Sequence, residues 1–337
     1  MTERRSAFLA RLAASGPFGF GASSLGNLYR PVEDDRARAT IEACWAHGVR
    51  YFDTAPFYGF GLSERRLGDG LRPRAHDDFI LSTKVGRLLA PGAAAAEARF
   101  GFCSPMPFEP VFDYSYDGVM RSFEASLHRL GLSRIDILYM HDIGAVTHAD
   151  AHGARFREAM DGGFRALAEL RDQGLVSAIG LGVNEVEVCA DSLAYADFDL
   201  FMIAGRYTLL DQAAGAFFDR CKQRGIGLVA AGVFNSGVLA TGVGTDTPHY
   251  DYGPAPDSVT ARVRAIERIC ADHGVPLAAA ALQFVTAHPA VTLAVIGTGS
   301  PSRIGQTLEM VSHRAPAEFW LALREAGLIA PEAPTPN

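Results

Sequence analysis

Three short apolar stretches of this chain each end on an ionisable side chain. Asp53, Lys84 and His141 close these stretches, and Tyr58 follows Asp53 by five residues. The stretches, residues 49–53, 79–84 and 135–141, have the length and apolar character of buried parallel strands. Active sites of parallel α/β barrels lie at the carboxyl ends of the strands, so we expect the four side chains to meet there.

Tyr58 and Lys84 have the chemistry for a proton transfer coupled to a hydride transfer. A phenol can exchange a proton with an oxygen whose carbon exchanges a hydride with a nicotinamide ring. The ordinary pKa of tyrosine, about 10, is too high for a base at neutral pH. A lysine ammonium ~4 Å away contributes up to ~4 kcal/mol at an effective dielectric of about 20, equivalent to about two to three pKa units. The sequence therefore predicts that Lys84 lowers the pKa of Tyr58.

The alternative is purely structural. Asp53 and Lys84 could form only a buried ion pair, with Tyr58 and His141 as core side chains. Their shared position at matched strand ends favours chemistry.

The order, spacing and strand-end setting of these four residues resemble the catalytic tetrad of the aldo-keto reductase superfamily. Residues 130–136, Leu-Gly-Leu-Ser-Arg-Ile-Asp, lead into the His141 strand as they do in that family. Residues 179–184 and 204–210 resemble the branch that contains L-fucose (D-threo-aldose) 1-dehydrogenases and pyridoxal 4-dehydrogenase. The similarity runs from about Phe18 to the C-terminal helix.

The resemblance implies an NAD(P)-dependent oxidoreductase. It would oxidise the anomeric hydroxyl of an aldose such as L-fucose or D-arabinose to the lactone, with Tyr58 as general acid/base. Asp53 would keep Lys84 charged and oriented, and neutral His141 would hydrogen-bond the substrate oxygen. The alternatives are a pyridoxal 4-dehydrogenase, a general aldehyde reductase, or a cofactor-binding regulatory subunit of potassium channels.

The resemblance also implies a set of cofactor-binding residues. Asn184 matches the family's carboxamide-binding pair, but Val183 replaces its serine and Ala204 replaces a glutamine. Relatives that need NADP have a lysine at Gly297, so we expect NAD or NADP with NAD favoured. The expected cofactor residues are Gly21, Ala22, Asp53, Asn184, Val233, Phe234, Ser236, Gly297, Ser300 and Arg303.

Strand and helix patterns alternate along the whole chain, which predicts an α/β fold of the (β/α)8 TIM-barrel type. Long loops are expected at the C-terminal face over residues 86–115 and 232–256, the first as an irregular segment. Their aromatic side chains could wall a substrate pocket above Tyr58 or only seal the loops onto the barrel. Ser63 and Asp117 are expected helix caps. Residues 316–326 predict an appended C-terminal helix that could fold over a barrel end.

Composition limits the possible partners. With 337 residues, 48% of them hydrophobic, we expect one barrel domain over residues 18–328, with 1–17 and 329–337 as terminal segments. The net charge of −7 gives no electrostatic basis for binding nucleic acid or anionic membrane. No apolar run approaches the ~20 residues that span a bilayer. Small-molecule partners are therefore expected.

The N-terminal residues and the cysteines indicate the expected cellular location of the protein. Arg11 interrupts the apolar stretch that imitates a signal peptide. Five scattered cysteines form no Cys-x-x-Cys pair. We therefore expect a cytoplasmic protein with reduced thiols.

One loop offers a competing metal site. His148, Asp150 and His152 have residue types that could ligate a metal in a barrel hydrolase. No other strand end supplies ligands, so we expect no metal here and a solvated loop instead.

Overall fold

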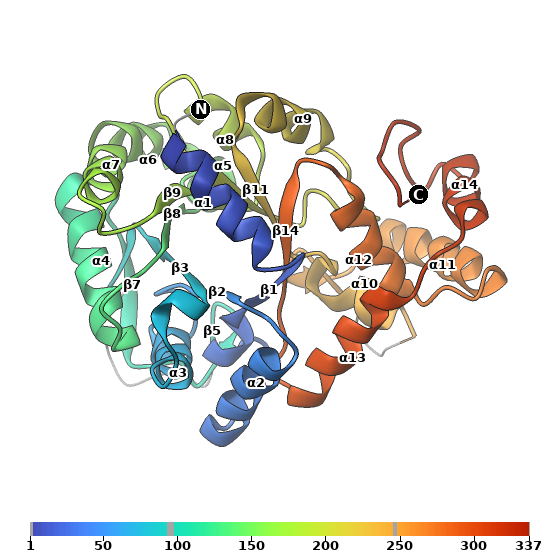
Figure 1. Ribbon diagram of the computed structural model, residues 1–337, viewed down its shortest axis with the longest axis horizontal. Helices are drawn as coiled ribbons and strands as arrows, with labels where there is room; N and C mark the ends of the chain where they lie inside the picture. Colours follow the sequence, from blue (N-terminus) through green and yellow to red (C-terminus); the bar gives the residue numbers. More distant parts are fainter. Residues whose placement is uncertain (1–2, 93–97, 245–247, 337) are drawn as a thin grey trace.

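The protein is a closed barrel of eight parallel strands (Figure 1). The computed structural model describes residues 3–92, 98–244 and 248–336. Around the barrel the strand order is β1, β14, β11, β10, β9, β8, β3, β2, and every neighbouring pair is parallel. The strands are β1 (Phe18–Gly21), β2 (Tyr51–Asp53), β3 (Ile80–Val85), β8 (Ile137–His141), β9 (Ala178–Val183), β10 (Leu200–Ala204), β11 (Gly227–Ala231) and β14 (Val291–Ile296). The predicted (β/α)8 barrel is confirmed.

Helices surround the barrel because their apolar faces pack on the outer side chains of the strands. They are α2 (Asp34–Ala46), α3 (Leu62–Leu71), α4 (Tyr116–Leu130), α5 (Ala145–His148), α6 (His152–Glu158), α7 (Phe164–Asp172), α8 (Glu187–Ser192), α9 (Gly215–Arg224), α10 (Val238–Thr241), α11 (Asp257–Asp272), α12 (Leu277–Ala287) and α13 (Pro301–Ser312). A π-helical turn, Ala159–Gly163, joins α6 to α7.

Both predicted caps are wrong. Helix α3 starts at Leu62, and Ser63 is instead buried, with its hydroxyl donating to the carbonyl of Ala22 at 2.6 Å. Helix α4 is capped by Ser115, whose Oγ accepts from the backbone N–H of Gly118 at 3.1 Å. A hydroxyl can bond to a distant segment of the chain as readily as to its own helix, and local sequence does not reveal which.

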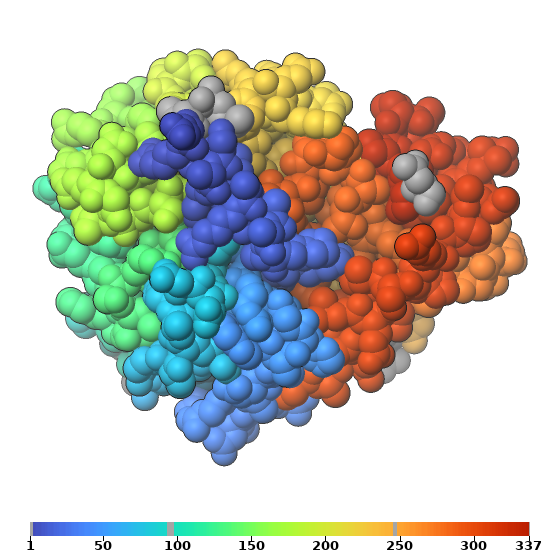
Figure 2. All heavy atoms as spheres, in the orientation of Figure 1, coloured from blue at the N-terminus to red at the C-terminus, as the bar shows by residue number. Residues whose placement is uncertain are grey.

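Helix α1 (Glu3–Ala14) closes the N-terminal end of the barrel. It lies across the barrel in Figure 1 and covers the centre of the face in Figure 2. Its Phe8 and Leu12 pack with the inward side chains of the strands, among them Tyr51, Tyr139 and Leu293. Residues 1–17, expected only as a terminal segment, therefore contain a helix that completes the core.

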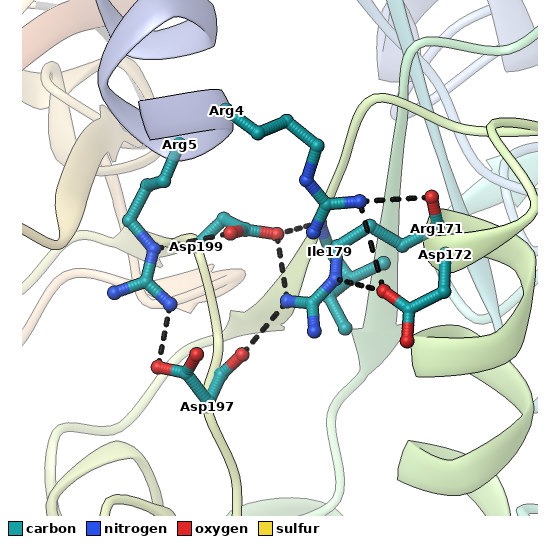
Figure 3. Close-up of polar contacts among 7 residues, drawn as sticks. All are labelled: Arg4, Arg5, Arg171, Asp172, Ile179, Asp197 and Asp199. Atoms are coloured by element: carbon teal, nitrogen blue, oxygen red, sulfur yellow. Dashed lines mark hydrogen bonds and ion pairs between the residues drawn. The ribbon is translucent and has the colours of Figure 1, made fainter. Parts of the chain in front are cut away.

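Ion pairs hold α1 in this position (Figure 3). The buried Arg5 donates from Nε to Asp199 Oδ1 at 3.1 Å and from Nη2 to Asp197 at 2.5 Å. Asp199 also accepts from Arg171 Nη1 at 3.1 Å and from the backbone N–H of Ile179 at 3.0 Å. Such a network stabilises the buried charges because each one has several partners.

The first long loop has regular structure. Strand β4 (Arg87–Pro91) pairs with β7 (Phe108–Phe112), and β5 (Ala98–Arg99) pairs with β6 (Phe102–Cys103), in two antiparallel ladders. The expectation of an irregular segment over 86–115 is therefore wrong. Long-range pairing supplies order that local periodicity does not indicate. Residues 93–97 of this loop, and 245–247 of the second, lie outside the described part of the chain.

The second long loop also carries a short hairpin. Strand β12 (His249–Tyr250) pairs with β13 (Gly253–Pro254). Asp251 and Tyr252 form its turn in the left-handed region, with φ of 45° and 66°.

The C-terminal helix α14 (Ala317–Glu325) packs beside α11 at the edge of the molecule in Figure 1 and does not cover a barrel end. Its Trp320 lies 6.5 Å, between ring centroids, from Phe284 of α12. Ile329 and Ala333 of the expected terminal segment are buried, and Arg324 donates to the carbonyl of Ala333 at 3.0 Å.

No single helix of the described residues is long and apolar enough to cross a membrane. Helices α11 and α12 are long and apolar enough for a membrane span only when taken together, and they are bent by 100° at their junction.

Candidate active site

Asp53 and Lys84 form a buried ion pair where β2 and β3 end. Lys84 Nζ donates to Asp53 Oδ2 at 2.6 Å and to the carbonyl of Thr54 at 3.0 Å. Burial raises the pKa of Asp53, an effect that Lys84 and Ser82 partly offset. Burial lowers the pKa of Lys84, but Asp53 and Tyr58 raise it by more, so the ammonium stays charged.

Tyr58 lies over this pair. Lys84 Nζ is 4.8 Å from the centre of the Tyr58 ring. Burial raises the pKa of the Tyr58 phenol, and the charge of Lys84 lowers it by less. Lys84 therefore lowers the pKa of Tyr58 as predicted, but the expected net lowering is wrong, because burial disfavours the phenolate more than one ammonium favours it.

His141 completes the group. Its ring centroid lies 6.0 Å from that of Tyr58, in an edge-to-face arrangement. Burial, Arg87 and Lys84 lower the pKa of His141 well below 6.5, so the imidazole is neutral. The structure therefore brings together the four predicted side chains at the carboxyl ends of β2, β3 and β8.

A hydrogen-bonded chain lies below the ion pair, inside the barrel. Ser82 Oγ donates to Asp53 Oδ1 at 2.7 Å, and Tyr51 OH lies 2.9 Å from Ser82 Oγ and 3.2 Å from Tyr139 OH. Ser82 was not among the site residues predicted from the sequence. The signal was its position two residues before Lys84, because alternate residues of a strand point to the same side.

Asp142 and Arg87 form a second buried ion pair beside His141, and neither residue was predicted from the sequence as part of the site. Asp142 Oδ1 accepts from Asn184 Nδ2 at 3.1 Å, and Asp142 Oδ2 lies 3.4 Å from His141 Nε2. Asp142 follows His141 directly, where strand alternation would direct the two side chains to opposite sides. Sequence pattern alone therefore gave no reason to include it.

Aromatic side chains cover one side of the site. Phe57 lies 5.6 Å from Phe102, 5.7 Å from Phe100 and 6.3 Å from His141, between ring centroids. Phe102 also lies 6.2 Å from Tyr58. Phe100, at the turn between β5 and β6, is 68% exposed, so an apolar ring remains accessible at the rim.

The turn between β12 and β13 also reaches the carboxyl ends of the strands. Tyr252 OH donates to Asn184 Oδ1 at 3.2 Å, and the Tyr252 backbone N–H donates to Ser236 Oγ at 3.0 Å. The rings of Tyr29 and His249 are in contact in a tilted arrangement, 5.6 Å apart between centroids, which joins the loop after β1 to this hairpin.

The expected cofactor residues follow the strand ends around one side of the barrel. Gly21 ends β1 in register with Asp53, and Ala22, next along the chain, is buried. A β-carbon on Gly297 would lie 2.9 Å from the carbonyl oxygen of Gly21, so a close backbone approach requires glycine there. Val233 is buried and Phe234 is half-buried in the loop after β11.

The turn before α13 and the first turn of that helix contain the remaining expected cofactor residues. Ser300, the N-cap of α13, is buried and accepts from Arg36 Nη2 at 3.1 Å, while Arg36 Nε donates to the carbonyl of Gly299 at 2.9 Å. Arg303 is exposed in the first turn of the helix. The backbone N–H groups at a helix N-terminus suit phosphate oxygens. Asn184 and the turn before this helix are therefore compatible with a nicotinamide dinucleotide, but Pro301 at the start of α13 has no N–H and the Ser300 N–H donates to Thr298 Oγ1.

The two histidines of the competing metal site have separate protein partners. His148 Nε2 lies 3.0 Å from Tyr114 OH, and His152 Nδ1 lies 3.3 Å from the carbonyl oxygen of Ile143. Within residues 3–92, 98–244 and 248–336, no group of three or more His, Cys, Asp or Glu side chains could hold a metal ion.

Known proteins resemble this chain over nearly its full length. The family model described as Aldo/keto reductase family matches residues 17–327. Pyridoxal 4-dehydrogenase of Microbacterium luteolum is 46% identical over 323 residues, which cover 93% of this chain and 94% of that protein. D-threo-aldose 1-dehydrogenase of a Pseudomonas species is 40% identical and covers 100% of both chains. An aldo-keto reductase structure from Bacillus halodurans has a TM-score of 0.70 at 22% identity, covering 92% of this chain and 91% of that one.

Proposed function

Because the chain belongs to the aldo/keto reductase family, we propose that it oxidises the anomeric hydroxyl of an aldose, such as L-fucose or D-arabinose, to the lactone with NAD or NADP. The observation that carries the proposal is the cluster of Tyr58, Lys84, Asp53 and His141 at adjoining strand ends. The relative named for dehydrogenation at carbon 1 of an aldose is 40% identical over the whole chain. In a cyclic aldose, carbon 1 bears the hemiacetal hydroxyl.

Each residue then has a defined part in the reaction. Tyr58 takes the proton of the anomeric hydroxyl while the same carbon loses a hydride. His141, being neutral, hydrogen-bonds the same oxygen and orients it. Lys84 stabilises the phenolate, and Asp53 holds Lys84 in place. Bound oxidised nicotinamide would supply the hydride acceptor and a positive charge that lowers the pKa of Tyr58.

The cofactor would be held along the strand ends. Asn184 would bind the carboxamide, with Val233, Phe234 and Ser236 beside the pyrophosphate. Gly21, Ala22 and Gly297 would allow close backbone approach, and Ser300 and Arg303 would meet the adenosine end. Asp53 would help to form the nicotinamide end of the site. No lysine stands at Gly297, which favours NAD.

A second substrate, pyridoxal, is favoured by a specific observation. Phe100 is exposed and Phe57 is half-buried, so they can offer ring faces or edges to a planar aromatic substrate, while the buried Phe102 packs against Phe57. The relative named for pyridoxal is 46% identical. Pyridoxal carries a hydroxymethyl group beside its aldehyde and closes to a cyclic hemiacetal, so its oxidation to a lactone uses the same steps as that of an aldose.

A substrate panel tests the proposal. We would assay L-fucose, D-arabinose, L-galactose and pyridoxal with NAD and NADP, following the absorbance of the reduced cofactor. Oxidation of a sugar supports the aldose proposal. Oxidation of pyridoxal alone supports the second candidate and rejects the first. Reduction of simple aldehydes without oxidation of any hemiacetal indicates a general reductase, and cofactor binding without turnover indicates a regulatory subunit.

A further inference from the structure

The buried carboxylate of Asp142 contacts both His141 and Asn184. Its Oδ2 pairs with Arg87 and faces His141 Nε2 at 3.4 Å, while its Oδ1 accepts from Asn184 Nδ2 at 3.1 Å. The Asp142 side chain is only 11% exposed. A buried carboxylate without partners would be costly, so this set of contacts determines where it can lie.

The backbone at Asp142 has an unusual conformation that makes these contacts possible. Its φ is +47°, in the left-handed region that side chains other than Gly, Asn and Asp rarely adopt. The Asp142 N–H donates to the carbonyl of Gly182 at 3.0 Å, which holds the turn. The turn lets His141 and Asp142 face each other although they are neighbours at a strand end. Such backbone outliers concentrate at functional sites.

Arg87 balances the charge of Asp142. Its guanidinium lies 4.2 Å from the ring centre of Phe57 and 5.2 Å from that of Phe112, and the residue is 5% exposed. A carboxylate alone beside the imidazole would favour its protonation. Arg87 opposes this, so His141 can remain neutral beside a carboxylate.

Neutral His141 carries its single ring proton on one of two nitrogens, Nδ1 or Nε2. Among the described residues, the buried Nδ1 atom has no hydrogen-bond partner. Nε2 instead faces the Asp142 carboxylate, which favours a proton on that nitrogen. At 3.4 Å this contact is longer than a well-formed hydrogen bond. The proton is therefore placed on Nε2. Because the contact with Asp142 is long, this N–H can still be donated to an oxygen in the site.

The same carboxylate orients the Asn184 amide. Asp142 accepts from its Nδ2, and Tyr252 OH donates to its Oδ1 at 3.2 Å, so each end of the amide has a defined partner. Val183 and Ala204, at the other two expected carboxamide positions, are apolar. Of the three expected positions, only Asn184 therefore has a polar side chain that could orient the carboxamide of a nicotinamide.

We propose that Asp142 is a positioning residue that sets both the Nε2–H tautomer of His141 and the orientation of the Asn184 amide. The inference rests on the proposed function, in which His141 binds the substrate oxygen and Asn184 binds the cofactor. The charged and titratable groups that face His141 are Asp142, Arg87, Lys84 and Tyr58. Asp142 contacts both His141 and Asn184.

The test is Asp142→Asn, which keeps the shape and removes the charge. We expect kcat to fall about a hundredfold, within the range for loss of general acid–base organisation. The dissociation constant of the cofactor, measured by fluorescence, should rise about tenfold, as for loss of a charge-assisted hydrogen bond. The substrate KM should change little. Asp69→Asn, which removes an exposed carboxylate paired with Arg72, is the matched control and should change none of these.

Nitrogen-15 NMR of histidine-labelled protein reads the tautomer directly. We expect the His141 resonance, assigned by its loss in His141→Gln, to show a protonated Nε2 in the wild type and a redistributed proton in Asp142→Asn. If the single variant does not fold because Arg87 is left unpaired, Arg87→Met combined with Asp142→Asn removes both charges and carries the same expectation.

Two results would overturn the inference. One is a raised substrate KM with unchanged kcat and cofactor affinity, which would make Asp142 a substrate contact. The other is a proton on Nδ1 in the wild type. The tautomer and the cofactor affinity are measured without turnover, so failure of every substrate in the panel rejects the proposed function and leaves this test intact.

Discussion

Gly26 lies directly against the peptide group that follows Tyr58. A β-carbon on Gly26 would come within 2.5 Å of the carbonyl carbon of Tyr58 and within 2.7 Å of the nitrogen of Gly59. A β-carbon on Gly59, whose φ is +63°, would lie 2.5 Å from the carbonyl oxygen of Gly26. The backbone at Gly26 thus limits where the backbone of Tyr58 can lie relative to the site.

Replacing Gly26 by Ala should move Tyr58. Neither backbone can give way easily, so we expect a loss of about 1–3 kcal/mol in the free energy of unfolding, typical of overpacking. kcat/KM should also fall, because Tyr58 shifts relative to Lys84. Urea unfolding and steady-state kinetics measure the two effects. Gly153→Ala, where the nearest atom is the flexible end of Arg157 at 4.0 Å, is the control. Unchanged kinetics in Gly26→Ala would contradict the positioning role.

Tyr58→Phe should abolish turnover and leave cofactor binding nearly intact. The hydroxyl acts in proton transfer, which contributes about 10²- to 10⁴-fold to rate, and not in holding the dinucleotide. kcat and the cofactor dissociation constant separate the two effects. Tyr195→Phe, at a residue that is 66% exposed, is the matched control. Retained activity in Tyr58→Phe would reject the assignment of the four residues.

NAD should serve at least as well as NADP. A lysine at Gly297 would supply a charge-assisted contact worth about 1.5–3 kcal/mol, and it is absent. Installing that lysine is a poor test, because any side chain at this position would press on the carbonyl oxygen of Gly21. Arg303→Ala is cleaner, since Arg303 is exposed, and it should reduce kcat/KM for NADP more than for NAD. A hundredfold preference for NADP in the wild type would contradict the expectation.

His141 should make the folded protein less stable in acid. Burial, followed by Arg87 and Lys84, lowers its pKa well below 6.5 in the folded state. As the pH falls below about 6.5, the unfolded chain binds a proton that the folded chain does not, and stability decreases by up to about 1.4 kcal/mol per pH unit. Above that pH the effect vanishes.

His141→Gln removes this proton uptake. We expect the variant to lose less free energy of unfolding than the wild type between about pH 7.5 and about pH 5.5 in urea titrations. His148 and His288, whose pKa values burial also lowers, contribute equally to both proteins and cancel in the difference. Equal losses in the two proteins would mean that His141 is not held neutral.

Much of this protein follows from one-dimensional patterns. The barrel was predictable because apolar runs and amphipathic segments alternate, and each type of run has few ways to bury itself. The meeting of Asp53, Lys84 and His141 followed from the same pattern, since parallel strands bring their carboxyl ends to one face.

Contacts between distant segments were not predictable in this way. Helix α1 fills the barrel end because Phe8, Leu12 and Arg5 find partners that local sequence does not specify. The ladder of β4 and β7 is likewise a long-range pairing.

The electrostatics of the site were decided only in the folded chain. The sequence alone identified Tyr58 and Lys84 as partners, but the pKa of Tyr58 depends on a balance of burial against charge that only the packed site determines. The contact of Asp142 with His141 depends on one left-handed residue, which reverses the alternation that sequence reasoning assumes. Chain order and residue chemistry determined which groups could react, and tertiary packing decided their protonation and orientation, because both depend on neighbours far apart in the sequence.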